Sequence, residues 1–280
     1  MRSLALLALF AACAAVPRPT RAPFEEFVQV SPEERWDEKE RWLVSTSVRE
    51  LAHPARDQRV TFLSMLHVGG EEYYRGLEPY LADADLVLAE GLHAPAPPAE
   101  GADDVAWVAR AYDALARVLG LARQAEWERR VADERWQTAD ALYEDVQGVL
   151  EGALRLEFGF EVRAFVAELE GRLAAGDVDP ALRRRAYRGV VNGVIDSYRS
   201  ETTPVRRLDA MREESMWRAL DEALDDPAHR HVVMICGAYH TWELEGRLVR
   251  ERKFRLARAR WHDAMAWHGP LYEVRPVAGR

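Results

Sequence analysis

Short apolar runs in the N-terminal part of the chain predict buried β-strands. The segment Arg59–Val68 (RVTFLSMLHV) is rich in β-branched and large apolar residues, and Asp85–Gly91 (DLVLAEG) is a second such run. Unbroken apolar runs of this length are typical of strands that are covered on both faces. Between them, Tyr73, Leu77 and Leu81 recur at helical spacing. This part of the chain therefore predicts one strand, helix, strand unit.

The C-terminal part of the chain returns to strand texture. A third apolar run, His231–Tyr239 (HVVMICGAY), precedes a charged helical pattern over Thr241–Arg252. Further strands are predicted in Phe254–Trp267, where apolar residues first alternate with arginine, and in Leu271–Pro276 (LYEVRP). Near the start of the chain, Trp42–Glu50 (WLVSTSVRE) predicts one more strand.

The middle of the chain has a different pattern. From about 103 to 224 it is charged and rich in Ala, Leu and Arg, with breaks near Gly120, Gly148–Gly152, Gly176–Pro180 and Thr202–Pro204. These breaks divide the segment into four to six predicted helices. The fold class predicted is α/β (α+β), with a central mixed β-sheet built from both ends of the chain and a helical insertion that forms a cap.

The first residues resemble an export signal. Residues 1–16 contain Arg2, an apolar run and small residues, the layout of a secretory signal peptide, and the run is too short to span a bilayer. Its end, LFAAC, resembles a lipoprotein box, which predicts either lipid attachment at Cys13 or ordinary cleavage nearby. Residues 17–40 are rich in proline and charge and predict a tether before a domain over 41–280. We therefore expect an exported protein of the cell envelope or periplasm.

Composition narrows the function classes. The chain has 280 residues, 48% of them hydrophobic, and a formal net charge of −9. It can build a substantial core, but the acidic balance argues against nucleic acid as a partner. A small peptide or small molecule is expected as substrate, with membrane contact only through an N-terminal lipid. Without Cys13, Cys236 has no disulfide partner, and its apolar setting predicts a core residue.

Three polar residues follow the three apolar runs. His67 ends the first, Glu90 ends the second and His240 follows the third. If the strands are parallel neighbours, these side chains meet where ligands bind in open α/β sheets. Two imidazoles and a carboxylate suit a divalent ion such as Mn, Co or Zn, which activates water for attack on a carbonyl. The alternative is that each residue is hydrogen-bonded for structural reasons alone.

A buried arginine points to the same place. Val205, Leu208, Met216, Ala219 and Ala223 form one apolar face of a predicted helix, and Arg212 lies within that stripe. Burying an unpaired guanidinium is costly, so Arg212 needs a carboxylate, a carbonyl or an anionic ligand. We expect it either in a structural ion pair or at the strand ends, where it would orient Glu90 or hold a substrate oxyanion.

Four segments together resemble the TraB/PrgY/GumN family, within a superfamily that includes Tiki proteins, erythromycin esterases and ChaN-like haem-binding lipoproteins. FLSMLHVG resembles its first Gly-x-x-His element, with Ser64 in place of glycine, and LVLAEG its glutamate strand. MREESMW resembles its Arg-Asp/Asn-x-x-Met helix, with Glu213 replacing Asp or Asn. VVMICGAYH resembles the second Gly-x-x-His element. Apart from these four, a fifth stretch, DERWQTAD, resembles a Trp-x-x-Ala-Asp stretch of some bacterial members.

The resemblance implies a sheet with a helical cap and, for Tiki-like members, a metal-dependent peptidase. It makes His67, His240 and Glu90 the metal ligands, and Glu90 and Arg212 the catalytic residues, of a hydrolase acting on peptide or amide bonds. Two alternatives remain open: a non-catalytic envelope protein that binds a peptide signal, and a haem- or iron-binding lipoprotein. His93 is a reserve ligand. The charge run Glu126–Arg130 is interpreted as a solvated helix face.

Overall fold

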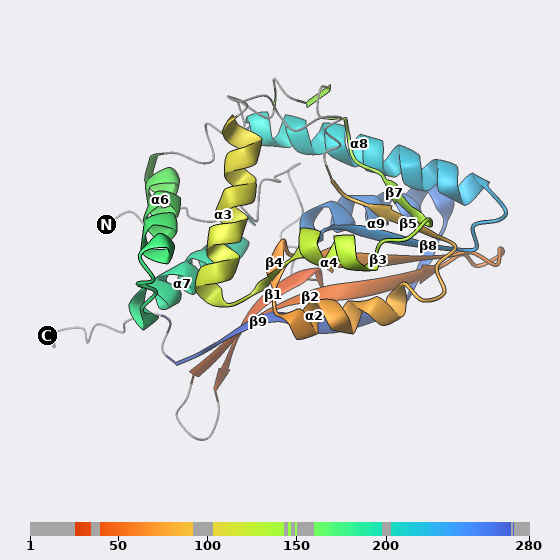
Figure 1. Ribbon diagram of the computed structural model, residues 1–280. Helices are drawn as coiled ribbons and strands as arrows, with labels where there is room; N and C mark the ends of the chain where they lie inside the picture. Colours follow the sequence, from red (N-terminus) through yellow and green to blue (C-terminus); the bar gives the residue numbers. More distant parts are fainter. Residues whose placement is uncertain are drawn as a thin grey trace, which may run out of the picture.

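Three parallel strands form the centre of the fold. The computed structural model describes residues 26–34, 40–91, 103–142, 145–146, 149, 160–197, 203–269 and 271. Strand β8 (His231–Gly237) lies between β3 (Arg59–Met65) and β5 (Leu86–Ala89) and is parallel to both (Figure 1). The two strands of the predicted strand, helix, strand unit are therefore not neighbours in the sheet, because β8, from the C-terminal part of the chain, lies between them. The short strand β7 (Trp136–Thr138) adds a fourth parallel strand beside β5.

The rest of the seven-stranded sheet is antiparallel and is organised around the long strand β2 (Glu40–Ala52). Strand β9 (Arg255–His268) pairs along one edge of β2. On the other edge, β1 (Val28–Glu34) and β3 follow one another end to end. The predicted mixed sheet built from both ends of the chain is therefore confirmed, including the strand predicted at Trp42–Glu50.

Strand β1 corrects the prediction of a tether over residues 17–40 at residues 28–34, whereas 17–25 and 35–39 lie outside the described residues. Phe27 and Val28 are buried, and β1 pairs with β2 from Val28 to Glu34. Pro32 and the surrounding charged residues argue against a strand in the sequence. Proline is nevertheless tolerated in an edge strand, where one side of the backbone needs no hydrogen-bond partner. The folded part of the chain therefore begins well before residue 41.

Alternation along β8 divides the core into two layers. Val232, Met234 and Cys236 face a cluster that includes residues of α8 (Thr203–Asp225) and α9 (Ala238–Arg252). Val233 and Ile235 face the opposite cluster, which includes α2 (Glu71–Leu77), followed by the 3₁₀ helix η2 (Glu78–Tyr80). Strands covered on both faces explain the unbroken apolar runs. The predicted core position of Cys236 is confirmed, and the cysteine is free.

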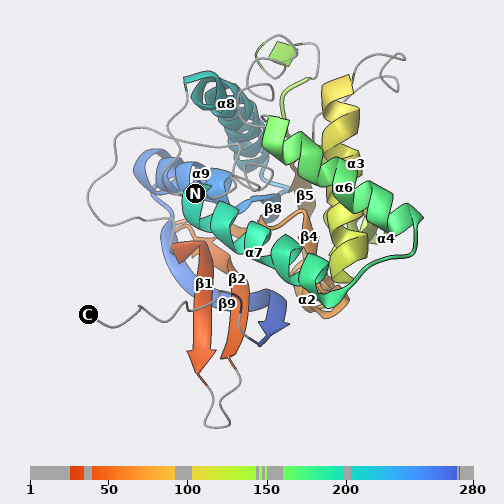
Figure 2. The same cartoon turned by 90° about the vertical axis from the view of Figure 1, so that its left-hand side faces the viewer.

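The middle of the chain supplies most of the helices. In the described residues it contains α3 (Asp103–Leu119), α4 (Gln124–Val131), α6 (Phe160–Ala174), α7 (Pro180–Ser197) and α8. Helices α6 and α7 pack against α3 at one end of the molecule, on the left in Figure 1 and facing the viewer in Figure 2. Two short strands were not predicted there: β7, and β6 (Ala122–Arg123), which pairs with β4 (Val68–Gly69) directly after His67.

Several sequence predictions lie outside the described residues. These are the signal peptide, the lipid attachment at Cys13, the reserve ligand His93 and most of the strand predicted at 271–276. Within the part that the structure describes, no helix is both long and apolar enough to cross a membrane.

Candidate functional site

The parallel strands bring the predicted site residues to one edge of the sheet. His67 follows β3 by two residues, Glu90 directly follows β5, and His240 lies in the first turn of α9, directly after β8. Nε2 of His240 is 3.8 Å from Oε1 of Glu90. We call His67, Glu90, Asp140, Arg212, Glu213 and His240 the strand-end cluster.

Glu90 is a fixed carboxylate at the centre of this cluster. Nη2 of Arg212 donates to its Oε1 at 2.7 Å, and the backbone N–H of Gly237 donates to its Oε2. Burial alone would raise the pKa of Glu90, but the positive charge of Arg212, followed by that of His240, lowers that pKa to about 2. A carboxylate with this pKa is a weak base at neutral pH, so its charge matters more than its ability to take a proton.

Arg212 holds two carboxylates, as its burial required. Its Nε lies 3.1 Å from each oxygen of Asp140, and its Nη2 donates to both Asp140 and Glu90. The Asp140 side chain has no exposed surface, and that of Arg212 is 14% exposed. The N–H of Ala139 donates to the carbonyl of Ala89 at 3.0 Å, which sets Asp140 beside Glu90.

Asp140 belongs to the site although its position in the sequence predicts no role for it. The signal that marks it is the stretch DERWQTAD, in which Trp136 lies on β7 and the aspartate follows the end of that strand. Its pairing with Arg212 spans 72 residues of sequence.

His240 lies between two carboxylates. Its Nδ1 is 3.2 Å from Oε1 of Glu213, its Nε2 faces Glu90, and the residue is only 1% exposed. Burial favours the neutral ring, but Glu90 and Glu213 outweigh it and raise the pKa of His240. The side chain of Glu213, one carbon longer than that of an aspartate, reaches the imidazole. His240 is therefore suited to hold a positive charge.

Ser64, which stands at the glycine position of the TraB/PrgY/GumN pattern that its segment resembles, is well accommodated at this position. It lies in β3, its side chain is buried, and its hydroxyl donates to Oγ1 of Thr241 at 3.2 Å. Its backbone conformation is one that any residue adopts, since Lys253 alone among the described non-glycine residues has a positive φ. The serine thus ties β3 to the first turn of α9, next to His240.

His67 differs from His240 in charge and setting. Its Nδ1 is 3.1 Å from Oε1 of Gln124, and its ring packs against Tyr112 with centroids 4.7 Å apart. Burial favours the neutral imidazole and lowers the pKa of His67, although Glu90 opposes the shift. Among the residues that the structure describes, its Nε2 has no hydrogen-bond partner. A neutral ring with a free nitrogen lone pair can accept a proton.

A metal site would require lone pairs of His67, Glu90 and His240 to meet at one point. Within the described residues, no group of three His, Cys, Asp or Glu side chains is arranged to hold a metal ion. Both oxygens of Glu90 already accept hydrogen bonds, and the guanidinium beside them repels a cation. As arranged, these residues do not fit a resident ion, so their metal ligation stays a prediction.

A cavity of about 360 Å³ lies elsewhere, along α6 and α7. It is lined by both arginines and acids, and none of the strand-end cluster contributes to it. Arg172 pairs with Asp179 at 2.6 Å, and Arg185 pairs with Glu168. Arg172 and Arg185 are thus neutralised by carboxylates of the same cavity, and none of the residues predicted from the strand ends lies there.

The fold and the site together define a mixed α/β protein with a buried charged cluster at the carboxyl ends of its parallel strands. Comparison with known proteins found no matching family model, no matching curated protein and no matching solved structure. The resemblance to the TraB/PrgY/GumN family therefore stays a prediction that rests on its motifs.

Proposed function

We propose that the protein is a hydrolase that cleaves amide or peptide bonds at the strand-end cluster. The observation that carries this proposal is the setting of His67: a neutral imidazole, with an Nε2 that has no partner among the described residues, beside a buried group of opposite charges. Such an arrangement pairs a base with electrostatic stabilisation, the two requirements for water to attack a carbonyl.

In the proposed reaction, Nε2 of His67 takes a proton from water as the water oxygen bonds to the carbonyl carbon. Negative charge develops on the carbonyl oxygen, where the positive charges of Arg212 and protonated His240 stabilise it. His67 then gives its proton to the leaving nitrogen as the carbon–nitrogen bond breaks. Glu90 keeps His240 charged and Arg212 oriented. No step passes through a metal ion. Export, and lipid attachment at Cys13, are retained as parts of the proposal.

The test is hydrolysis of a panel of internally quenched peptides and simple amides by the purified protein. We expect His67→Ala to lower kcat by about 100-fold or more, because general base catalysis contributes that much, while the unfolding midpoint stays near that of the wild type. His268→Ala is the matched control, since His268 is exposed at the end of β9.

Chelator treatment and elemental analysis of the same preparations test the metal prediction. Full activity of His67→Ala would contradict the proposal. Saturable peptide binding by a wild-type protein that cleaves nothing in the panel would also contradict it, and would favour the alternative of an envelope binding protein.

A further inference from the structure

A chain of hydrogen bonds leads from His67 away from the charged cluster. Oε1 of Gln124 lies 3.1 Å from Nδ1 of His67, and Nε2 of Gln124 donates to Oε1 of Glu128 at 2.8 Å. Gln124 is buried and is the first residue of α4, and Glu128 lies one turn further along that helix. The hydrolase mechanism above gives neither residue a part.

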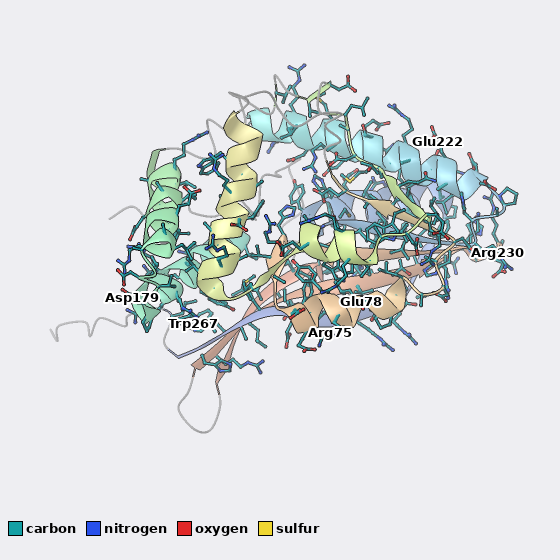
Figure 3. All side chains as sticks on the ribbon, in the orientation of Figure 1. Arg75, Glu78, Asp179, Glu222, Arg230 and Trp267 are labelled. Carbon is teal, nitrogen blue, oxygen red and sulfur yellow. The ribbon has the colours of Figure 1, made fainter. Side chains whose placement is uncertain are left out.

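The backbone holds this chain in place independently of the side chains. The N–H of Gln124 donates to the carbonyl of His67 at 2.9 Å, and the two residues after His67 pair, as β4, with the two residues before Gln124, which form β6. Trp127 anchors α4: its ring stacks on Tyr74, and its Nε1 donates to Glu78, which lies close to α4 in Figure 3. A change in the Gln124 side chain therefore leaves the contact between α4 and His67 in place.

The order of donors and acceptors along these two hydrogen bonds determines which atoms carry the protons. A carboxylate at Glu128 accepts only, so it draws the amide NH₂ of Gln124 toward itself and leaves the amide oxygen facing His67. The reverse orientation would set two acceptor oxygens against each other. A carbonyl oxygen also accepts only, so Nδ1 of His67 must carry the proton. Its Nε2 is then the nitrogen with the lone pair.

We propose that Gln124 and Glu128 are positioning residues that hold His67 in the Nδ1–H tautomer, so that the lone pair of Nε2 faces the strand-end cluster. The tautomer itself does not depend on the proposed hydrolase function, whereas its use as a base rests on that function. In water, the imidazole of histidine prefers the opposite tautomer, with the proton on Nε2. The proposal therefore predicts a state that the ring would not adopt without Gln124.

The test is NMR of protein labelled with ¹⁵N in its histidines, in which long-range ¹H–¹⁵N correlations show which ring nitrogen carries the proton. Spectra are recorded at a pH of about 8.5, because burial raises the pKa of Glu128 to about 7 and the carboxylate form is wanted. The signals of His67 are identified by their loss in His67→Gln. We expect the wild type to show a protonated Nδ1 and an unprotonated Nε2.

Four variants make the test specific. Gln124→Leu removes the acceptor, and we expect the proton to move mainly to Nε2. Glu128→Leu leaves Gln124 free to turn, and we expect a mixture of tautomers. The double variant Gln124→Glu/Glu128→Gln exchanges the two side chains, keeps an acceptor facing His67, and should keep the Nδ1–H form. Gln137→Leu, at an exposed position of β7, should leave the His67 signals unchanged.

A wild type with its proton on Nε2, or an unchanged tautomer in Gln124→Leu, would overturn the proposal. If Gln124→Leu does not fold, Glu128→Leu takes its place, and an unchanged tautomer of His67 in that variant would overturn the proposal. Turnover separates this inference from the proposed function. If the protein is a hydrolase, Gln124→Leu should lower kcat about 10-fold or more with little change in KM, and the exchange variant should recover much of the loss. If the wild type and the variants show the expected tautomers but the wild type shows no turnover, only the hydrolase proposal is contradicted.

Discussion

At the scale of single residues, the energetics of the site are dominated by Arg212. Its guanidinium is satisfied by carboxylates 72 and 122 residues away in sequence, and both partners are more deeply buried than the arginine. The planar fork of arginine suits two carboxylates at once. Losing one partner would leave a buried charge undercompensated, which costs far more than losing an exposed ion pair.

Asp140→Ala tests this directly. We expect it to lower the free energy of unfolding by about 3 kcal/mol, because it leaves the buried guanidinium with Glu90 alone. Urea unfolding followed by circular dichroism measures the change. Asp225→Ala is the control, since Asp225 is exposed and pairs with Arg252 at the surface, and its loss should shift the midpoint much less. Equal shifts in the two variants would show that Asp140 contributes no more than a surface charge.

Glu90 makes a pH-dependent contribution to stability. Its pKa falls from an ordinary value of 4.5 to about 2 in the folded protein. A depressed folded-state pKa stabilises the fold above the unfolded pKa, and this contribution is lost as the pH falls toward the folded value. The gap in unfolding free energy between wild type and Glu90→Gln should therefore shrink by about 3 kcal/mol between pH 6 and pH 2. A gap that does not vary with pH in urea titrations would refute this assignment.

At the scale of elements, the strand ends and the first turn of α9 form one unit. The hydroxyl of Ser64 bonds Thr241, and the N–H of Gly237 bonds Glu90, so β3, β5, β8 and α9 are joined by short polar contacts within a few residues of His240. A Cβ on Gly237 would lie 3.3 Å from Oε2 of Glu90, which leaves little room for any larger residue there. The close approach of backbone to carboxylate depends on this glycine.

Ser64→Gly tests whether a glycine, as in the pattern that this segment resembles, would serve the site better than the serine. We expect the glycine to destabilise the protein by about 2 kcal/mol, since it removes a buried hydrogen bond and adds backbone freedom to a strand. Ser64→Ala, which removes only the hydroxyl, should cost about 1 kcal/mol. Urea unfolding of both variants measures these losses, and peptide hydrolysis shows whether turnover follows. Higher stability or higher turnover in Ser64→Gly would mean that the serine impairs the site.

At the scale of the whole molecule, the sequence predicted the parts with strong local signals. The runs that became β3, β5 and β8 are apolar throughout because both faces of the sheet are covered, and a residue at the end of such a strand is easy to locate. His67, Glu90 and His240 followed from that rule, and Arg212 followed from its position on an apolar face. The order of the strands does not follow from local patterns, because the C-terminal strand β8 lies between β3 and β5.

What the sequence could not reveal depends on packing between distant segments. Glu128 lies within the charge run Glu126–Arg130, which predicts a solvated helix face, and Gln124 lies two residues before it. In the structure, however, Gln124 and Trp127 are buried. The spacing of the two polar residues is that of any exposed helical pair, so only the docking of α4 beside His67 gives them a role. The stretch DERWQTAD marks Asp140 in the sequence, but its role depends on packing of the same kind, because its partner Arg212 is on α8.

The N-terminal boundary of the fold is the last point that can be tested. Phe27 and Val28 are 2% and 1% exposed, and the guanidinium of Arg49 lies over the Phe27 ring at 4.7 Å while it pairs with Glu245. A protein that starts at Glu40 would lose strand β1 and this cover. We expect it to be less stable than a protein that starts at Glu26 by about 4 kcal/mol, from the two apolar side chains alone.

Urea unfolding of the two shortened proteins, with proteolysis of β2 as a second measurement, tests this boundary. Without β1, the half of β2 that pairs with it has an open edge, so cleavage there should be faster. The protein that starts at Glu26 is the control, because it keeps β1 and removes only the residues before it. If both proteins unfold at the same urea concentration and resist proteolysis equally, β1 contributes nothing and the folded unit begins at β2, as the sequence first suggested.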